Sequence, residues 1–384
     1  LETALGLRRA TREPRRAAVL VLVLGAATLG GFGLSMLAHL DRATTAVGWH
    51  EVGAAFRVTS RAGVLPDRFD PSTLPGVEAS ARVFHTTVAT RGVPGFELLA
   101  VDLPAYRAVV SGTPLDTPVP QELLEASGPP YPAIVSTDVA SDVNGVRLGD
   151  VFGVGVLGRT IEVRAVAVRD SFPTLEPRGR FAVVSLAQLS ADAERPIATS
   201  AVFLRAPDDA TAKLRRALDT LRRGLVLDSR VEHTSAFRTS PVIAAVSDGL
   251  AVSLALDVVF AALALLAALT IAGSARAVEG AHLRALGMRP RQRIGLAIAE
   301  HGATLAVGLG LGLGLGLWLF SVLEPGLGYA ALIGSELTVP PDLDAAYVAV
   351  AVGTAALIGV LALALAVMLE GSIPSAAALR PGIE

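Results

Sequence analysis

The sequence contains no cysteine and a single lysine, and charged residues make up only 18% of its 384 positions. The absence of cysteine excludes disulfides, thiolate metal sites and cysteine nucleophiles. A nucleotide-hydrolysing domain of the G-x-x-x-x-G-K-[ST] type needs a lysine that follows a glycine-containing loop, because this lysine reaches the outer phosphates. Lys213, in "TAKLRR", does not follow a glycine-containing loop of this kind. This chain therefore supplies no such ATPase site.

Catalytic and metal-binding patterns are also missing from the sequence. The histidines are scattered without metal-site spacing, and no nucleophile triad or paired-carboxylate site can be argued from the residues. The run "GLGLGLGLGLW" (308–318) lies inside an apolar stretch, whereas a dinucleotide fingerprint needs a preceding strand and a polar opening. We therefore expect no catalytic residue, cofactor site or metal site in this chain.

Apolar residues dominate the composition, at 52% of the chain with a mean hydropathy of +0.55. A transmembrane helix needs about 20 mostly apolar residues. Four stretches meet this requirement: 17–38, 242–271, 294–320 and 345–369. The first is too long for a signal peptide and lacks a convincing cleavage site. The sequence predicts a membrane protein with four transmembrane α-helices.

The arginines predict which segments stay in the cytoplasm. Five arginines lie in segment 1–16 and five more in segment 272–293, whereas segment 321–344 has four acidic residues and no basic one. Basic segments remain inside the cell. We therefore expect segments 1–16 and 272–293 inside, segment 321–344 outside and the tail 370–384 inside. These positions predict a multi-pass membrane protein with both termini in the cytoplasm.

Residues 39–241 form the large segment between the first two apolar stretches, and their composition predicts an extracytoplasmic α+β domain. Short alternating or β-branched runs read as strands. These runs are 54–60, 80–90, 132–137, 160–168, 180–185 and 199–206. Helices are expected at 120–127 and 208–224, and the second membrane helix could begin as a stalk beneath this domain.

The apolar stretches contain glycine and acidic residues, which are unfavourable in a membrane helix unless they make specific contacts. Gly308, Gly312 and Gly316 share one helix face, and small residues at this spacing allow close helix packing. Asp248, Asp257 and Glu300 are costly in a bilayer and should face a partner or a wet cavity. For Asp257, a polar contact in the bundle and a gating or relay role both stay open.

The stretch "VEGAHLRALGMRPRQRIGLAIAEHGATLAVGLGLG" (278–312) resembles the signature of the FtsX-like permease family of ABC transporters. The matching features are Glu279, the Leu283–Gly287 turn, a basic run, Glu300 and a glycine-rich span. Gly280, His282 and Pro290 depart from the family's usual residues. The stretch "RLGDVFGVGVLGRTIEVRAVAV" (147–168) resembles that family's Leu-Gly-Asp turn and strand pair, and the ending "AAALRPGIE" resembles its usual one. The first residues resemble the linker into the second unit of longer, two-unit permeases.

This resemblance implies a non-catalytic permease subunit of the bacterial plasma membrane, which works with a separate ABC ATPase that binds ATP and Mg. The implied docking surface is a short coupling helix, carrying Glu279, Leu283, Arg284, Leu286, Gly287, Arg289 and Arg291. Further expected partners are membrane lipid and a second permease unit, in a homodimer, a heterodimer or the other half of a longer chain. A lipoprotein or cell-wall hydrolase is a further candidate, and no nucleic acid is expected.

Three functions fit these expectations. In the first, the permease transmits ATP-driven movement to its outer domain, to export or extract a lipophilic substrate. In the second, the same movement controls an extracytoplasmic hydrolase or reports a ligand without transport. The third is a membrane-anchored binding protein that needs no ATPase. The sequence does not separate the first two.

Overall fold

The computed structural model describes the backbone of residues 14–90, 93–125, 128–141, 145–156, 158–192, 197–221, 224–285, 290–326, 337, 339, 345–350, 352–354, 356–357 and 360–361. Side chains are described for these residues except 14–19, 89–90, 93–96, 192, 264–285 and 290–305. The chain divides into two compact units, and the first boundary falls between Asp41 and Arg42. We call them the helical unit (residues up to 41, 244–328 and from 340) and the sheet unit (42–243 and 329–339).

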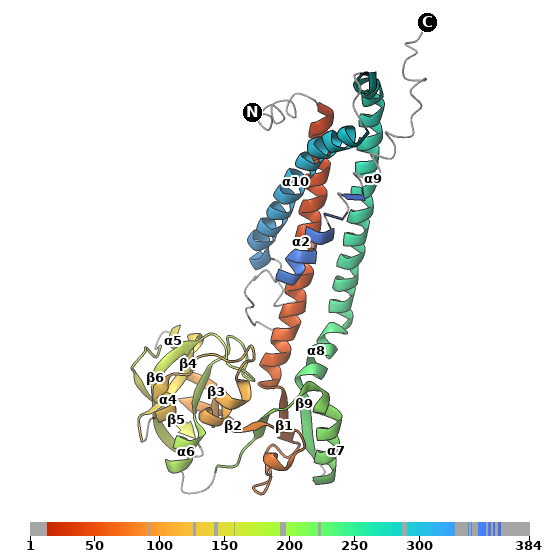
Figure 1. Ribbon diagram of the computed structural model, residues 1–384. Helices are drawn as coiled ribbons and strands as arrows, with labels where there is room; N and C mark the ends of the chain where they lie inside the picture. The colour runs from red at the N-terminus through yellow and green to blue at the C-terminus, as the bar shows by residue number, and fades with distance from the viewer. Residues whose placement is uncertain are drawn as a thin grey trace. The chain divides into compact units, whose positions relative to one another are not determined.

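Three long helices run through the described part of the helical unit: α2 (Pro14–Val52), α9 (Pro241–Ala285) and α10 (Pro290–Leu323), which is followed by the short η3 (Glu324–Gly326) (Figure 1). Each long helix starts at a proline, whose fixed φ suits the first helical position and whose missing N–H would have no partner there. Within the described residues, three segments are long and apolar enough to cross a membrane, Leu20–Val52, Pro241–Leu263 and Ala306–Gly326. The described part of the fourth apolar stretch includes a shorter apolar helix, Ala345–Thr354.

The first two long helices extend beyond the apolar stretches that predicted them. Helix α2 continues from the expected end at Ala38 to Val52, because no proline interrupts this segment. It ends at Gly53, where φ is +78° and the N–H donates to Trp49 O at 2.9 Å, as is common at helix C-termini. Helix α9 continues through residues 272–285, where a short separate coupling helix was expected. The backbone of residues 272–285 is therefore helical, in a segment for which the sequence predicts a cytoplasmic loop with a short coupling helix.

The sheet unit contains a mixed sheet whose described strands follow the order β5-β6-β4-β7-β3-β2-β8-β1-β9. Its strands are β1 (Phe56–Ser60), β2 (Ala79–Thr90), β3 (Val93–Val101), β4 (Tyr131–Ser136), β5 (Val151–Val156), β6 (Arg159–Arg169), β7 (Phe181–Ser185), β8 (Ala201–Arg205) and β9 (Leu225–Ser229). The pairs β3–β7 and β4–β6 are parallel, and the other strand pairs are antiparallel. The predicted strand pair in residues 147–168 corresponds to β5 and β6.

Short helices cover the sheet on both faces. They are η1 (Pro71–Thr73), α3 (Leu103–Val110), α4 (Gln121–Glu125), α5 (Thr137–Ser141), α6 (Leu186–Asp192), η2 (Asp208–Ala210), α7 (Thr211–Leu221) and α8 (Arg230–Arg238). Every residue of β4 and β7 is buried, which explains their continuous apolar runs. Apolar side chains of α3 and α4 pack in one buried cluster, and those of α5, α6 and the β5–β6 pair pack in another.

A third buried cluster holds α7 against the strands at the other edge of the sheet. Leu214 and Leu218 of α7 pack with Phe56 of β1 and Leu204 of β8, and each of these side chains is at most 2% exposed. Full burial of such a side chain contributes about 1.5 to 3 kcal/mol. The cluster therefore fixes β1, which follows α2, and β9, which precedes α8, in the core of the sheet unit.

Candidate functional site: membrane helices and the last turn of α2

The glycine face of α10 lies against α2 within the helical unit. A Cβ added at Gly312 would lie 2.6 Å from both Ala27 Cβ and the Leu24 carbonyl oxygen. A Cβ added at Gly308 would lie 3.1 Å from Val23 Cγ1, and one at Gly316 would collide with the Thr28 carbonyl. By contrast, a Cβ at Gly310 or Gly314 would meet no heavy atom within 4 Å. The two helices therefore approach closely along the face that carries Gly308, Gly312 and Gly316.

Aromatic and polar side chains continue this contact toward the C-terminal end of α10. The rings of Phe32 and Phe320 meet edge to face with centroids 6.2 Å apart, and Phe320 is only 2% exposed. The His39 ring lies 5.7 Å from the Phe320 ring, and its Nε2 lies 3.6 Å from Glu324 Oε1. These contacts hold the end of α10 and the start of η3 to α2.

Asp257 lies on the side of α9 that faces α2. A Cβ added at Gly30 of α2 would lie 3.3 Å from Asp257 Oδ2, so the glycine leaves room for the carboxylate. One turn away, a Cβ at Gly33 would lie 2.8 Å from Leu254 Cδ2. Asp248 is exposed, and the side chain of Glu300 lies outside the described residues. Asp257 thus occupies the contact between two helices, where either of its predicted roles could operate.

The predicted coupling residues lie largely outside the described part of the structure. Leu286, Gly287 and Arg289 fall between α9 and α10, in a segment that the structure does not describe. The backbones of Glu279, Leu283, Arg284 and Arg291 belong to helices, but their side chains are not described. The docking surface for an ATPase therefore stays a prediction.

Each residue of the last turn of α2, Gly48–Glu51, contacts a residue from elsewhere in the sheet unit. We call this turn the α2 joint. Gly48 packs so closely on the side chain of Thr234 in α8 that a Cβ has no room. The guanidinium of Arg230 lies 4.5 Å from the centre of the Trp49 ring, a cation–π arrangement. The first two residues of the joint therefore both contact α8.

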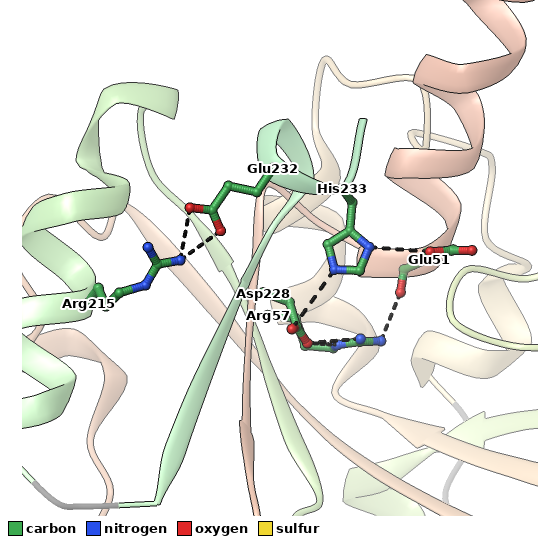
Figure 2. Close-up of polar contacts among 6 residues, drawn as sticks. All are labelled: Glu51, Arg57, Arg215, Asp228, Glu232 and His233. Atoms are coloured by element: carbon green, nitrogen blue, oxygen red, sulfur yellow. Dashed lines mark hydrogen bonds and ion pairs between the residues drawn. The ribbon is translucent and has the colours of Figure 1, made fainter. Parts of the chain in front are cut away.

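Glu51 begins a polar network that connects the α2 joint to β1, β9 and α8 (Figure 2). His233 Nδ1 lies 3.3 Å from Glu51 Oε2, and His233 Nε2 lies 3.9 Å from Asp228 Oδ1. Arg57 donates from Nε and Nη2 to Asp228 Oδ2 at 3.0 and 2.9 Å, and from Nη1 to the Glu51 carbonyl at 2.8 Å. Charged hydrogen bonds of this kind are stronger than neutral ones. The network therefore holds the entering helix, two strands and the leaving helix at one place.

His50 holds the opposite side of the α2 joint. Its Nε2 lies 2.8 Å from the Leu175 carbonyl, and its own carbonyl accepts from Thr174 N–H at 2.7 Å. A carbonyl can only accept, so Nε2 carries the hydrogen. Burial lowers the pKa of His50 below its usual value, which favours the neutral ring. The loop between β6 and β7 is thereby fixed to the end of α2.

The residues that form the α2 joint were not predicted as a site from the sequence. Their contacts join residues that are 182 positions apart for Glu51 and His233 and 171 apart for Arg57 and Asp228. The pairing of β1 with β9, which sets Arg57 directly opposite Asp228, brings them together. Among the described residues, no group of three or more histidine, aspartate or glutamate side chains is placed to hold a metal ion.

Comparison with known proteins identifies the helical region. Residues 251–371 match the family model of the FtsX-like permease C-terminal region. No curated protein matches the sequence significantly.

Solved structures with low similarity include the extracellular domain of the ABC-type transporter YknZ from Gram-positive bacteria, at 14% identity and a TM-score of 0.31, covering 45% of this chain and 98% of that one. The periplasmic region of MacB from Actinobacillus actinomycetemcomitans has 10% identity and a TM-score of 0.32, covering 50% and 96%. A domain of a protein described as a permease from Porphyromonas gingivalis has 15% identity and a TM-score of 0.26, covering 47% and 88%.

These TM-scores are low, so the assignment rests on the family match and on the apolar helices. The resemblance predicted from the stretch 278–312 falls within the matched region, and the three apolar helices agree with a membrane protein. The predicted resemblance is therefore confirmed: residues 251–371 of this chain match the C-terminal region of FtsX-like permeases.

Proposed function

We propose that this chain is the permease subunit of a bacterial ABC transporter and that a separate ATPase powers it from the cytoplasm. The observation that carries this proposal is the family match over residues 251–371. The sequence supports it, because the only lysine of the chain, Lys213, is not part of a phosphate-binding loop. ATP and Mg would bind to the partner ATPase, and this chain would supply the membrane helices and the sheet unit that move.

The proposed topology has four transmembrane helices and places the sheet unit outside the cell. The arginine-rich segments 1–16 and 272–293 support a cytoplasmic position for both, since basic segments are retained inside. Helices α2, α9 and α10 would form three of the crossings, and the apolar stretch 345–369 would form the fourth. The segment with Glu279 and Arg284 would then face the ATPase.

Movement would reach segment 42–243 of the sheet unit through the two chain connections of that segment to the membrane helices. The chain enters that segment within α2 and leaves it through β9, α8 and the first residues of α9. Both connections meet at the α2 joint, where the network of Glu51, Arg57, Asp228 and His233 holds them. A change in the position of α9 relative to α2 would therefore act first on this joint. Export or extraction of a lipophilic substrate is the work we assign to that movement.

ATP turnover by the purified chain tests the division of labour. Purified alone in detergent, the chain should hydrolyse no ATP above background, because it lacks the lysine-bearing phosphate loop. Adding back the co-purifying ATPase should restore turnover. Hydrolysis that persists after every other protein has been removed would refute the proposal.

A further inference from the structure

The α2 joint is held on two sides that differ in chemistry. One side consists of the contacts to α8, the helix that leads into α9: mostly polar contacts, with the close packing of Thr234 on Gly48. The other consists of two hydrogen bonds between His50 and the loop between β6 and β7, one donated by His50 and one by Thr174. These sides would respond differently to a pull on α8, because partly hydrated ion pairs exchange with water more easily than buried hydrogen bonds do.

Three α8 residues make polar contacts on this side: Arg230 lies against the Trp49 ring, Arg238 Nη2 donates to Thr45 Oγ1 at 3.2 Å, and His233 lies beside Glu51 and Asp228. His233 is the residue of α8 that lies near both Glu51 and Asp228, and its side chain is 32% exposed. The neighbouring Glu232 points away from α2 and accepts from Arg215 of α7 at 2.9 and 2.7 Å (Figure 2). Exposed pairs of this kind contribute little to stability. Water can therefore replace the contacts of His233 at little cost.

Two buried polar atoms on α8 make the closed contact less favourable. Arg230 Nε and Thr234 Oγ1 are buried and have no hydrogen-bond partner among the described residues. Both residues contact α2, through Trp49 and Gly48. Buried polar groups are usually paired, and an unpaired one costs free energy that hydration would return. Separation of α8 from α2 would therefore expose both atoms to water, which can form the missing hydrogen bonds.

The buried side has the opposite properties. Phe172 and Leu175 of the β6–β7 loop are each 2% exposed and belong to the core of the sheet. His50 is buried, and both of its hydrogen bonds to this loop are satisfied at 2.7 and 2.8 Å. Its release would expose apolar surface and leave buried backbone groups without partners. This side should stay closed when the polar side opens.

We propose that the α2 joint is a one-sided latch, in which α8 releases from the last turn of α2 while the β6–β7 loop stays fixed to it. The open and closed positions of α8 would give α9 two discrete orientations relative to α2 outside the membrane. The use of this latch in a transport cycle rests on the proposed function. The latch itself is a property of the sheet unit and can be measured without an ATPase.

Spin labels can measure the two sides separately, since the chain has no native cysteine. One label pair, on Ala46→Cys and Ala236→Cys, reports the distance between α2 and α8. The second pair, on Ala46→Cys and Glu176→Cys, reports the distance between α2 and the β6–β7 loop. Double electron–electron resonance on the full chain in lipid nanodiscs, without nucleotide, gives the distribution of each distance.

The variant His233→Ala removes the α8 contacts to Glu51 and Asp228 but leaves the pairing of Arg57 with Asp228 intact. We expect it to increase the population with a longer Ala46–Ala236 distance by about two- to fivefold, the effect of losing a partly exposed polar pair. The Ala46–Glu176 distance should stay unchanged. The matched control is Glu232→Gln, which weakens the adjacent pair to Arg215 and should change neither distance.

A third variant tests the buried side. His50→Ala should broaden the Ala46–Glu176 distances, and if this variant fails to fold, the result with His233→Ala still decides the proposal. An unchanged Ala46–Ala236 distribution in His233→Ala would overturn it, because the polar contacts would then not hold α8. Equal broadening of both distances in that variant would also overturn it, since the joint would then loosen as a whole. ATPase data play no part in these outcomes, so they are independent of the proposed function.

Discussion

At Gly312, α10 leaves no room for a side chain against α2. The variant Gly312→Ala would place its Cβ 2.6 Å from Leu24 O and Ala27 Cβ, a contact that requires the helices to separate. We expect it to lower the free energy of unfolding by about 1 to 3 kcal/mol. Gly314→Ala is the control, because a Cβ there meets nothing within 4 Å and alanine favours a helix. Thermal unfolding in detergent measures both, and equal effects of the two variants would show that this face is not in close contact.

His50 makes the stability of the sheet unit depend on pH. Burial lowers its pKa in the folded chain, whereas the unfolded chain titrates near 6.5. As the pH falls below about 6.5, the unfolded chain binds a proton that the folded chain does not, so stability decreases by at most about 1.4 kcal/mol per pH unit. His50→Gln should remove this part of the slope. Chemical unfolding of both proteins between pH 7 and pH 5 measures it, and identical slopes would contradict the assignment of a buried, neutral His50.

At the scale of elements, the end of α9 and the segment that follows it should contain the docking surface for the ATPase. Changing Leu283 and Leu286 to Asp should weaken the complex by two orders of magnitude or more, because each buried leucine contributes about 1.5 to 3 kcal/mol and about 1.4 kcal/mol corresponds to a factor of ten. Arg289→Gln with Arg291→Gln is the control and should have a smaller effect. The ATPase retained by each variant is measured after equal membrane insertion has been checked. Retention by the leucine variant together with loss by the arginine variant would mean that the surface is electrostatic.

Elements with a strong local pattern could be predicted from the sequence, and those that depend on distant contacts could not. The runs 80–90 and 160–168 lie within β2 and β6, because their alternating or β-branched residues suit a sheet. Strand β3 was missed, because Pro94 and Gly95 weaken its local pattern and its place in the sheet depends on pairing with β2 and β7. Helix α2 continues beyond the apolar stretch 17–38, because an apolar stretch predicts a membrane-spanning segment and not the full length of the helix.

The same distinction applies to the candidate site. The glycine spacing on α10 is a local pattern, and it could be recognised without a partner helix. The α2 joint has no such pattern, because Glu51 and His233 are 182 residues apart and meet only after β1 has paired with β9. The partner of each charged residue is therefore decided by the register of the sheet and not by its neighbours in the sequence.

At the scale of the whole molecule, the proposed topology places the sheet unit and the segment around Arg289 on opposite sides of the membrane. An enzyme reporter that is active only outside the cytoplasm should work when inserted at the exposed turn of Gly63, or near Ser335. The same reporter should fail near Arg289, because the arginines of that segment keep it inside. Equal amounts of each fusion protein are confirmed by immunoblot. Reporter activity near Arg289 would contradict the four-helix arrangement.

The central claim is that this chain acts as the permease of a separate ABC ATPase, and isolation of the chain from native membranes tests it most directly. The tagged chain is purified in mild detergent, and the accompanying proteins are identified by mass spectrometry. We predict that an ATPase with a lysine-bearing phosphate loop is recovered in a fixed ratio to the chain, and that the leucine variant at positions 283 and 286 loses it. Recovery of the intact chain without any ATPase, under conditions that preserve other membrane complexes, would contradict the claim.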